Sequence, residues 1–304
     1  MRLEIEVKIS ARVFAYEIAF DFPPLFKEMR IVEEKLQVDS TPVYTRELAQ
    51  VEVHKDARND AASFRLDWHL AALPIIQDRG KEDPLNIFKL WLSRLLILNP
   101  IPQLITGESE ESTLLPQPDL SDFGAWFTGL LKLTPAAYTT VDGYLKDVMP
   151  DFEDVQNQAI GSENHQLLVQ FASQTGKMQI PLEALSDGEK GMLTCALVLG
   201  ANRHAGPVVC FWDEPDGHLA LDEVAAFIMG LRKAYQGQGQ FIATSHNPRA
   251  IDTFSDENTL LLYRKSHLEP TNVRSIADLR AGGQIIGNLA DAMIRGDLIA
   301  HEQK

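Results

Sequence analysis

The chain contains 304 residues, of which 45% are hydrophobic and 23% charged, a composition that is ordinary for a soluble globular protein. Its formal net charge of −15 at pH 7 argues against broad nonspecific attachment to nucleic acid, but it does not exclude a local basic patch or DNA as a ligand. No apolar run approaches the roughly 20 residues of a membrane-spanning helix, and the acids among the first residues exclude a signal peptide, so no membrane association is expected.

The first part of the chain, residues 1–56, is predicted to be an antiparallel β subdomain. Apolar and charged side chains alternate over 2–9, and the alternation resumes over 14–20, which is the period of half-buried strands. Further strands are predicted over 31–38, 43–46 and 51–54. An independent β-domain is the alternative interpretation of the same pattern.

The second part, residues 57–165, is predicted to be largely helical. Helices are predicted over 61–76, from Pro84 through Leu96, over 123–133 and over 136–148. The stretch from 100 to 118 holds four prolines and is predicted to be a loop. The tryptophans of this part are most simply core residues, and they are Trp68, Trp91 and Trp126.

The third part, residues 166–275, begins with a predicted hairpin over 167–181 that leads to a helix. Ser186 is followed three residues later by Glu189 and then by an apolar run, which is the capping box of a helix that extends to residue 200. The free amides and the positive dipole end at Gly188, beside the Ser186 hydroxyl, suit a phosphate. An ordinary capped helix is the alternative interpretation.

The next element is an apolar stretch, too short for a helix, that ends in the adjacent acids Asp213 and Glu214. This pattern predicts a buried parallel strand that delivers both carboxylates to its carboxyl end, where ligands bind in open α/β sheets. Cys195, in the preceding helix, and Cys210, in this strand, lie in apolar runs. They are predicted to be inert core residues of a reduced, cytoplasmic protein.

A second short apolar strand begins at Gln240 and ends in Ser245-His246, after an amphipathic helix predicted over 221–235. A short helix from Ile251 and strands over 259–263 and around 273 complete the third part. The last part, residues 276–304, is predicted to be a helical tail. Its apolar stripe, over 285–299, either docks on this chain or contacts a partner.

Taken in order, these elements resemble the C-terminal half of an ABC-type ATPase head, as in the Rad50, RecF and SMC group. They resemble still more closely the bacterial AAA-like predicted ATPases with the signature Leu-Ser-Asp-Gly, which include the ATPase halves of OLD-type phage-defence proteins. The matching residues are Leu185-Ser186-Asp187-Gly188 for the signature, Asp213-Glu214-Pro215 for Walker B, Asp216-Gly217-His218-Leu219 for the D-loop and Thr244-Ser245-His246 for the switch histidine. The resemblance implies an α/β, P-loop NTPase-like ABC ATPase head with an antiparallel β subdomain and a lever-like helical insertion.

The resemblance also implies roles for these residues. In such heads two subunits enclose two ATP molecules, so a homodimer through the nucleotide interface is expected. Asp213 would bind Mg²⁺, Glu214 would orient and deprotonate the attacking water, and His246 would contact the γ-phosphate. The residues expected to hold the γ-phosphate of the other subunit's ATP are Ser186, Gly188 and Glu189. The implied function is ATP hydrolysis in DNA repair or phage defence, with an effector nuclease or another protein as partner.

No Gly-x-x-x-x-Gly-Lys-Ser/Thr sequence, the Walker A loop that holds the β- and γ-phosphates, occurs in the 304 residues. One interpretation is that the chain starts downstream of this segment, as a truncated product or half of a split protein, and is inactive until the segment is supplied. The alternative is a catalytically inactive interaction module that has lost the loop. Two residues depart from related patterns: Asp187 replaces the glycine of the transporter signature, and Ala220 stands where many ABC proteins place a D-loop aspartate.

Overall fold

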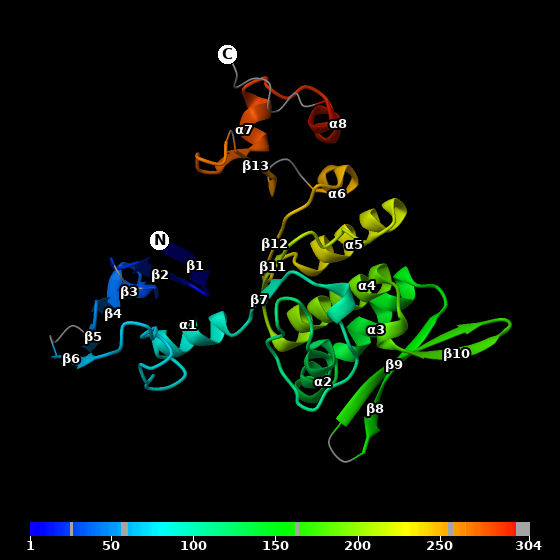
Figure 1. Cartoon of the computed structure of the whole chain (residues 1–304), viewed down its shortest axis with the longest axis horizontal. Coiled ribbons are helices and arrows are strands. Elements are labelled where there is room, and N and C mark those ends of the chain that lie inside the picture. Colours follow the sequence, from blue (N-terminus) through cyan, green and yellow to red (C-terminus); the bar gives the residue numbers. More distant parts are fainter. Residues whose placement is uncertain (25–26, 56–59, 162–163, 255–257, 265, 296–304) are drawn as a thin grey trace. The chain divides into compact units, whose positions relative to one another are not determined.

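A computed structural model describes residues 1–24, 27–55, 60–161, 164–254, 258–264 and 266–295. The chain divides into two compact units, Met1–Ser93 and Arg94–Lys304, and each has its own hydrophobic core (Figure 1). The mixture of helices and sheets confirms the predicted α/β class. The four-part division drawn from the sequence stays a prediction.

The first unit contains an antiparallel sheet whose strands are paired in chain order. The strands are β1 (Arg2–Ile9), β2 (Arg12–Asp21), β3 (Arg30–Val38), β4 (Thr41–Glu47), β5 (Gln50–Lys55) and β6 (Asp60–Arg65). The predicted opening meander is therefore confirmed. Helix α1 (Pro84–Leu92) is capped by the Asp83 side chain and places Phe88 in the core, where its ring stacks 6.0 Å from that of Phe14.

Two helix predictions in the second part were wrong. The predicted helix over 61–76 is instead strand β6, which pairs with β5, followed by turns. The helix that begins at Pro84 ends at Leu92, because Leu95 and Leu96 belong to strand β7 (Leu95–Leu98) of the second unit. Pairing with a neighbouring strand overrode the local helical pattern in both places.

The second unit is built around a parallel sheet with the order β12-β11-β7. In its centre lies β11 (Val209–Trp212), flanked by β7 and by β12 (Gln240–Ala243), and both pairings are parallel. The predicted acid-bearing and histidine-bearing strands are thus confirmed as neighbours in one sheet. Because the strands are parallel, the residues that follow each of them emerge at the same edge.

Helices cover one face of this parallel sheet, on the same side of β7, β11 and β12 in Figure 1. They are α2 (Phe123–Leu133), α3 (Ala137–Val148), α4 (Asp187–Gly200) and α5 (Leu221–Ala234). The core side chains of the sheet, such as Cys210 and Trp212, are buried against them, and the Trp212 ring lies 5.7 Å from that of Phe227 in α5. Cys195 in α4 is also buried and free, and burial raises the pKa of its thiol to about 12.

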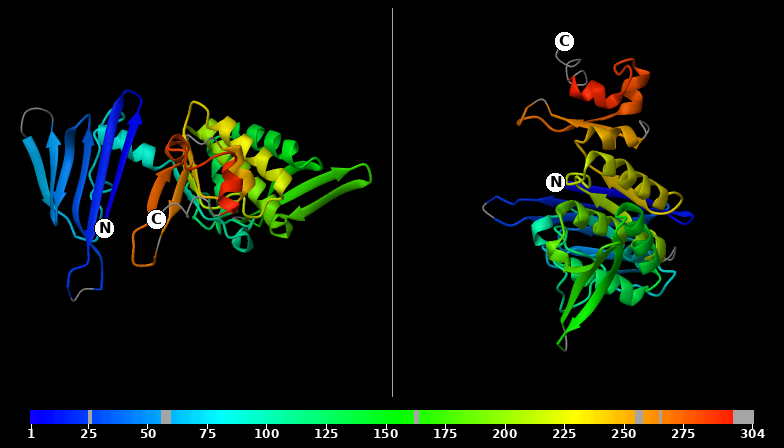
Figure 2. Two further views of the ribbon diagram at one scale, coloured as in Figure 1. Left: turned by 90° about the horizontal axis from the view of Figure 1, so that it is seen from above. Right: turned by 90° about the vertical axis from the view of Figure 1, so that its right-hand side faces the viewer.

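A second, antiparallel sheet precedes α4 in the chain, with the order β10-β9-β8. Its strands are β8 (Phe152–Ile160), β9 (Asn164–Ser173) and β10 (Gly176–Pro181). The predicted hairpin corresponds to β9 and β10, whereas β8 lies in a region for which no strand was predicted. These hairpins extend away from the helices in Figures 1 and 2.

The end of the second unit forms a small cluster around Ile276, Leu279 and Leu289. Its elements are α6 (Pro248–Thr253), β13 (Leu260–Tyr263), β14 (Asn272–Ser275), α7 (Ile276–Ala281) and α8 (Leu289–Ile294). The predicted tail helix over 285–299 corresponds to α8, and its last residues lie outside the described part. Within the described residues, every helix is too short or too polar to traverse a lipid bilayer.

Candidate functional site

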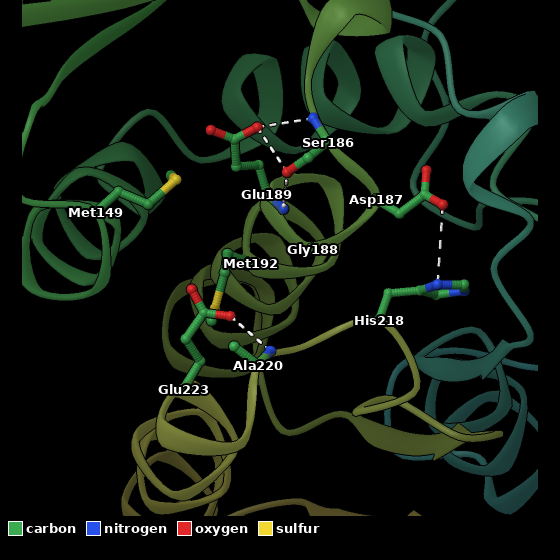
Figure 3. Close-up of a pocket in the computed structure, with 9 residues that line it drawn as sticks. All are labelled: Met149, Ser186, Asp187, Gly188, Glu189, Met192, His218, Ala220 and Glu223. Carbon is green, nitrogen blue, oxygen red and sulfur yellow. Dashed lines mark hydrogen bonds and ion pairs between the residues drawn. The ribbon is translucent and has the colours of Figure 1, made fainter.

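The first group of predicted site residues lies at the start of α4. Ser186 is the N-cap, and its hydroxyl accepts a hydrogen bond from the Glu189 amide at 3.3 Å. The Glu189 carboxylate accepts in return from the Ser186 amide at 2.7 Å and from the Ser186 hydroxyl at 2.8 Å (Figure 3). The predicted capping box is therefore confirmed, and a carboxylate occupies donors at the end of the helix that attracts anions.

These residues border an open pocket of 450 Å³. Figure 3 shows that the lining comes from the starts of α4 and α5, the residue after α3 and His218 in the turn after β11. The lining residues are Met149, Ser186, Asp187, Gly188, Glu189, Met192, His218, Ala220 and Glu223. Glu223 is folded back onto the Ala220 amide at 2.9 Å, so each of the two helices closes its first turn with a glutamate. The pocket combines two positive helix ends with side-chain carboxylates.

The second group lies at the carboxyl end of β11, where Asp213 and Glu214 follow the strand. The Thr244 hydroxyl, at the end of β12, donates to the Asp213 carboxylate and accepts from the Glu214 amide at 3.0 Å. One hydroxyl thus fixes the start of the acid pair. The Asp213 amide donates to the Leu98 carbonyl at 2.8 Å, which ties the same point to β7.

Glu214 has a backbone φ of +47°, a left-handed conformation that side-chain-bearing residues rarely adopt. Its amide is held by Thr244, and its carbonyl accepts from the Gly217 amide at 3.1 Å. This backbone turn directs the carboxylate toward the next strand end, where His246 Nε2 lies 3.5 Å from Glu214 Oε1. Both side chains face solvent, with exposed fractions of 90% for His246 and 55% for Glu214.

Asp216 links the acid pair to the histidine strand from the inside. It is 3% exposed, and its carboxylate accepts a hydrogen bond from the Ser245 hydroxyl at 3.0 Å. The same hydroxyl accepts from the Asn247 amide at 3.0 Å. Burial raises the pKa of Asp216 above its usual value, and the nearby Glu214 charge acts in the same direction.

The two groups meet through the predicted D-loop, Asp216-Gly217-His218-Leu219. The His218 carbonyl would lie only 3.0 Å from a Cβ added to Gly188, so glycine permits this close approach. His218 Nδ1 also lies 3.8 Å from the Asp187 carboxylate (Figure 3). Within the described residues, Ser186 and Glu189 make no direct bond to Glu214 or His246. The structure therefore forms two adjoining clusters.

Sequence reasoning assigned no role to several residues that position these clusters. Thr244 and Ser245 were matched to the switch motif only as neighbours of His246, yet their hydroxyls hold Asp213 and Asp216. Lys190 is 6% exposed and donates to the Pro102 carbonyl at 2.9 Å, which joins α4 to the turn after β7. The helix predicted from the capping box includes Lys190, but the distant carbonyl that it contacts could not be inferred from the sequence.

The side-chain atoms at this point that could bind a cation are oxygens: the Asp213 carboxylate and the Thr244 hydroxyl beside it. Within the residues that the structure describes, no cluster of three or more histidines, cysteines, aspartates and glutamates gathers as a metal site. The Asp213 carboxylate would be a ligand to Mg²⁺ of the kind found where phosphates and waters supply most of the remaining ligands.

The chain was also compared with known proteins. No protein-family model matches it, and no curated protein matches it. Its structure is similar to that of an SMC ATPase characterised for ATP-driven dimerization and DNA-stimulated activation, with 15% identity, a TM-score of 0.39, and coverage of 53% of this chain and 99% of that one. An Smc head bound to the C-winged-helix domain of ScpA has 12% sequence identity and a TM-score of 0.47, and the match covers 88% of this chain and 76% of that one. The SMC head domain from Thermotoga maritima has 11% sequence identity and a TM-score of 0.32, and the match covers 80% of this chain and 67% of that one.

Proposed function

We propose that this chain is part of an ABC-type ATPase head that binds and hydrolyses ATP at a composite interface between two copies. The observation that carries the proposal is the 3.5 Å separation of Glu214 Oε1 and His246 Nε2, at the carboxyl ends of two adjacent parallel strands. In open α/β sheets this edge is where ligands bind. A carboxylate and an imidazole that both face solvent are available to one phosphate group and its attacking water.

The proposed chemistry assigns one task to each side chain. Glu214 orients a water molecule and takes its proton, and His246 donates a hydrogen bond to the transferred phosphoryl group. Thr244 orients the Asp213 carboxylate, which would bind Mg²⁺. When bound, Mg²⁺ supplies charge neutralisation of the phosphate oxygens. Because phosphoryl transfer depends mainly on positioning and charge, we expect the fixed backbone at Glu214 to contribute by positioning its carboxylate.

The signature cluster is proposed to act on the nucleotide of the second copy. Ser186 and the amides of Gly188 and Glu189 lie at the start of α4, where an anion is favoured. The Ser186 hydroxyl is bonded to the Glu189 carboxylate in the chain alone. A phosphate must therefore displace this carboxylate. We expect the affinity of the cluster for anions to be low until the second copy brings its ATP against it.

The triphosphate also needs a Walker A loop, which the 304 residues lack. The proposal therefore assigns ATP hydrolysis to an assembly in which a further segment supplies that loop. The biological setting that we propose is DNA repair or phage defence, in which the head would work with an effector nuclease or another protein.

The decisive variant is Glu214→Gln, in the chain supplied with a segment that carries Gly-x-x-x-x-Gly-Lys-Ser. Removal of the general base is expected to slow ATP hydrolysis by about 10²–10⁴-fold while ATP-driven pairing persists. Turnover is measured by phosphate release and pairing by sedimentation. Asp222→Asn, at an exposed carboxylate in the first turn of α5, is the matched control and should keep parental turnover. Equal turnover of Glu214→Gln and the parent would refute the assignment.

The missing loop favours a second candidate, a catalytically inactive interaction module. Titration of labelled ATP and Mg²⁺, with the chain alone and with the loop segment, separates the two candidates. The ATPase head predicts saturable ATP binding once the loop is present, whereas the interaction module predicts no nucleotide binding under either condition.

A further inference from the structure

The edge of the parallel sheet that lies opposite the Asp213–Glu214 cluster carries basic side chains and no acids. Strands β7, β11 and β12 begin at this edge, where α4 leads into β11 and α5 leads into β12. The stretches of the chain that meet there are 94–96, 131–140, 200–209 and 232–241. None of them contains an aspartate or glutamate, although 43 of the 304 residues are acidic. We call this region the basic end, and its basic residues are Arg94, Lys132, Arg203, His204, Arg232 and Lys233.

Hydrogen bonds from Asn202 join two of these stretches. The side chain is fully buried; its nitrogen donates to the Ala234 carbonyl at 3.0 Å, and its oxygen accepts from the Val208 amide at 2.9 Å. The Asn202 carbonyl accepts from the Gln238 side chain at 2.9 Å. The start of β11 is therefore fixed against the end of α5 and the turn before β12.

The other two stretches contact the turn that follows α4. His204 Nε2 lies 2.9 Å from the Thr140 hydroxyl, in the first turn of α3. The Arg94 guanidinium lies against Gly206, 2.7 Å from the position that a Cβ would occupy. Gly206, with a φ of +112°, thus leaves the room that the arginine fills. The basic end is therefore built jointly from four stretches of the second unit.

Three cations of the basic end are available to a ligand. Arg94, Arg203 and Lys233 are exposed, and within the described part of the chain their side chains make no ion pair or hydrogen bond. Arg232, by contrast, donates to the Thr253 carbonyl at 2.6 Å. The helix dipole favours cations at the carboxyl ends of helices. That effect explains Arg203 and Lys233 individually, but it does not explain why acids are missing from the neighbouring turns as well.

The turn between α5 and β12 adds backbone donors. Gly237 and Gly239 have φ values of +83° and +70°, in the left-handed region that glycine allows. Among the described residues, no acceptor is bonded to the amides of Gly237, Gln238 and Gly239, and all three residues are exposed. Successive amides in such a turn favour an anion. Together with the guanidinium and ammonium groups, they suit a carboxylate or phosphate ligand.

The acidic character of the rest of the chain decides which anion fits. The net charge of −15 would repel a long polyanion such as duplex DNA wherever it extends beyond the basic end. The two tyrosines of these stretches are not free to stack on bases, because Tyr138 donates to the Asp154 carboxylate and the Tyr235 hydroxyl is buried. A short acidic peptide, in contrast, needs only the exposed cations and amides that this surface offers.

We propose that the basic end is a docking surface for an acidic peptide segment of a partner polypeptide. Carboxylates of that segment pair with Arg94, Arg203 and Lys233, and the amides of residues 237–239 donate to its oxygens. The surface lies at the opposite edge of the sheet from Glu214 and His246 and shares no residue with them. The proposal therefore does not depend on the nucleotide chemistry.

The probe is a fluorescein-labelled oligoglutamate peptide, added to the full 304-residue chain at low and at physiological salt. Fluorescence anisotropy measures its affinity, and an oligoglutamine peptide of equal length is the uncharged control. We expect saturable binding of oligoglutamate at low salt that weakens about tenfold or more as salt rises, since salt screens exposed charges. Amide NMR of the deuterated chain should show shifts at Gly237, Gln238 and Gly239 that saturate with the peptide.

Charge reversals locate the contact. Arg203→Glu and Lys233→Glu should each weaken oligoglutamate binding about fivefold or more, because each replaces an attraction by a repulsion. Arg65→Glu in β6 and Lys8→Glu in β1 change the net charge equally at exposed positions of the first unit, so they are matched controls and should bind like the parent. Thermal unfolding shows whether each variant is folded, and the amide shifts of the parent test the proposal without any variant.

Several results would overturn the proposal. Oligoglutamate binding that is absent at low salt, or equally weakened by all four reversals, would mean that the basic end makes no specific contact. Tighter binding of a duplex DNA of equal charge, lost in Arg203→Glu and Lys233→Glu, would assign the surface to nucleic acid. Amide shifts at residues 237–239 that grow with protein concentration in the chain alone would assign it to a second copy. Since ATP enters none of these measurements, their outcome is independent of the proposed function.

Discussion

At the scale of single residues, Glu214 combines the carboxylate that we propose as the general base with an unfavourable backbone conformation. Its φ of +47° is fixed by the bond from its amide to Thr244 and by the turn to Gly217. A left-handed conformation costs about 1–2 kcal/mol for a residue with a side chain. Such strain is frequent where a side chain must be aimed at a ligand.

We predict that Glu214→Gly is more stable than Glu214→Ala by about 0.5–1 kcal/mol, because the relief of left-handed strain exceeds the greater entropy that glycine has in the unfolded chain. The midpoint and slope of urea unfolding give both free energies of unfolding. Both variants lose the carboxylate, so the comparison isolates the backbone. The opposite order of stability would show that the φ at this position is not strained.

Asp216 makes stability depend on pH. Its carboxyl is buried, so its pKa is higher in the folded than in the unfolded chain, and the folded chain binds the proton more tightly. The contribution of Asp216 to the free energy of unfolding therefore falls as pH rises from its usual pKa through its raised pKa in the folded chain. At neutral pH the buried carboxylate is charged, and its full destabilising effect is present.

We predict that Asp216→Asn raises the free energy of unfolding at pH 7, and that the gain disappears as the pH falls below the usual pKa of an aspartate. The asparagine oxygen can still accept from Ser245, so the hydrogen bond is preserved. Urea unfolding at a series of pH values measures the effect. Asp222→Asn, at an exposed carboxylate, is the control and should show no comparable gain.

At the scale of elements, α4 depends on its cap. Ser186 caps the first turn of the helix, and 10 of its 14 residues are buried. We predict that Ser186→Ala lowers the free energy of unfolding by about 1 kcal/mol, whereas Ser186→Asn keeps most of it, because asparagine caps helices about as well as serine. Chemical denaturation of both variants measures the difference. Equal losses in the two variants would mean that the hydroxyl, and not capping in general, is required.

The fold could be predicted where the local sequence shows a strand or helix periodicity or a helix cap. The strands up to β5 follow from alternation, and α2 and α4 follow from helical spacing and the capping box. Strand β6 was missed because residues 61–76 were assigned to a helix, whereas Phe64 pairs with Val51 of β5. Strand β7 has four consecutive apolar residues, which have no period, and only its pairing with β11 defines it.

The candidate site divides in the same way. Asp213, Glu214 and His246 could be located because each follows a short apolar strand, and the structure brings Glu214 and His246 together. The part of Thr244 could not be predicted, since its partners depend on the register between β11 and β12. The same holds for the left-handed turn at Glu214, which no local residue preference indicates.

At the scale of the whole molecule, each of the two units has its own main core. Phe88 lies in the core of Met1–Ser93, and Leu130 lies in that of Arg94–Lys304. We predict two unfolding transitions in calorimetry of the full chain. Phe88→Ala should lower the midpoint of one transition and Leu130→Ala that of the other, since large-to-small core changes cost about 2–5 kcal/mol within the unit that contains them. A single transition shifted equally by both variants would show that the chain unfolds as one cooperative unit.

The contact between Gly188 and the His218 carbonyl has a mechanical consequence. The five residues from Glu214 to His218 form a short connecting turn. The proposed general base, Glu214, lies at its first residue, and the carbonyl of its last residue, His218, lies close to Gly188. A side chain at position 188 would displace this connecting turn, whose first residue, Glu214, is hydrogen-bonded through its amide to Thr244. A displacement of either cluster is therefore transmitted to the other through the backbone of residues 214–218.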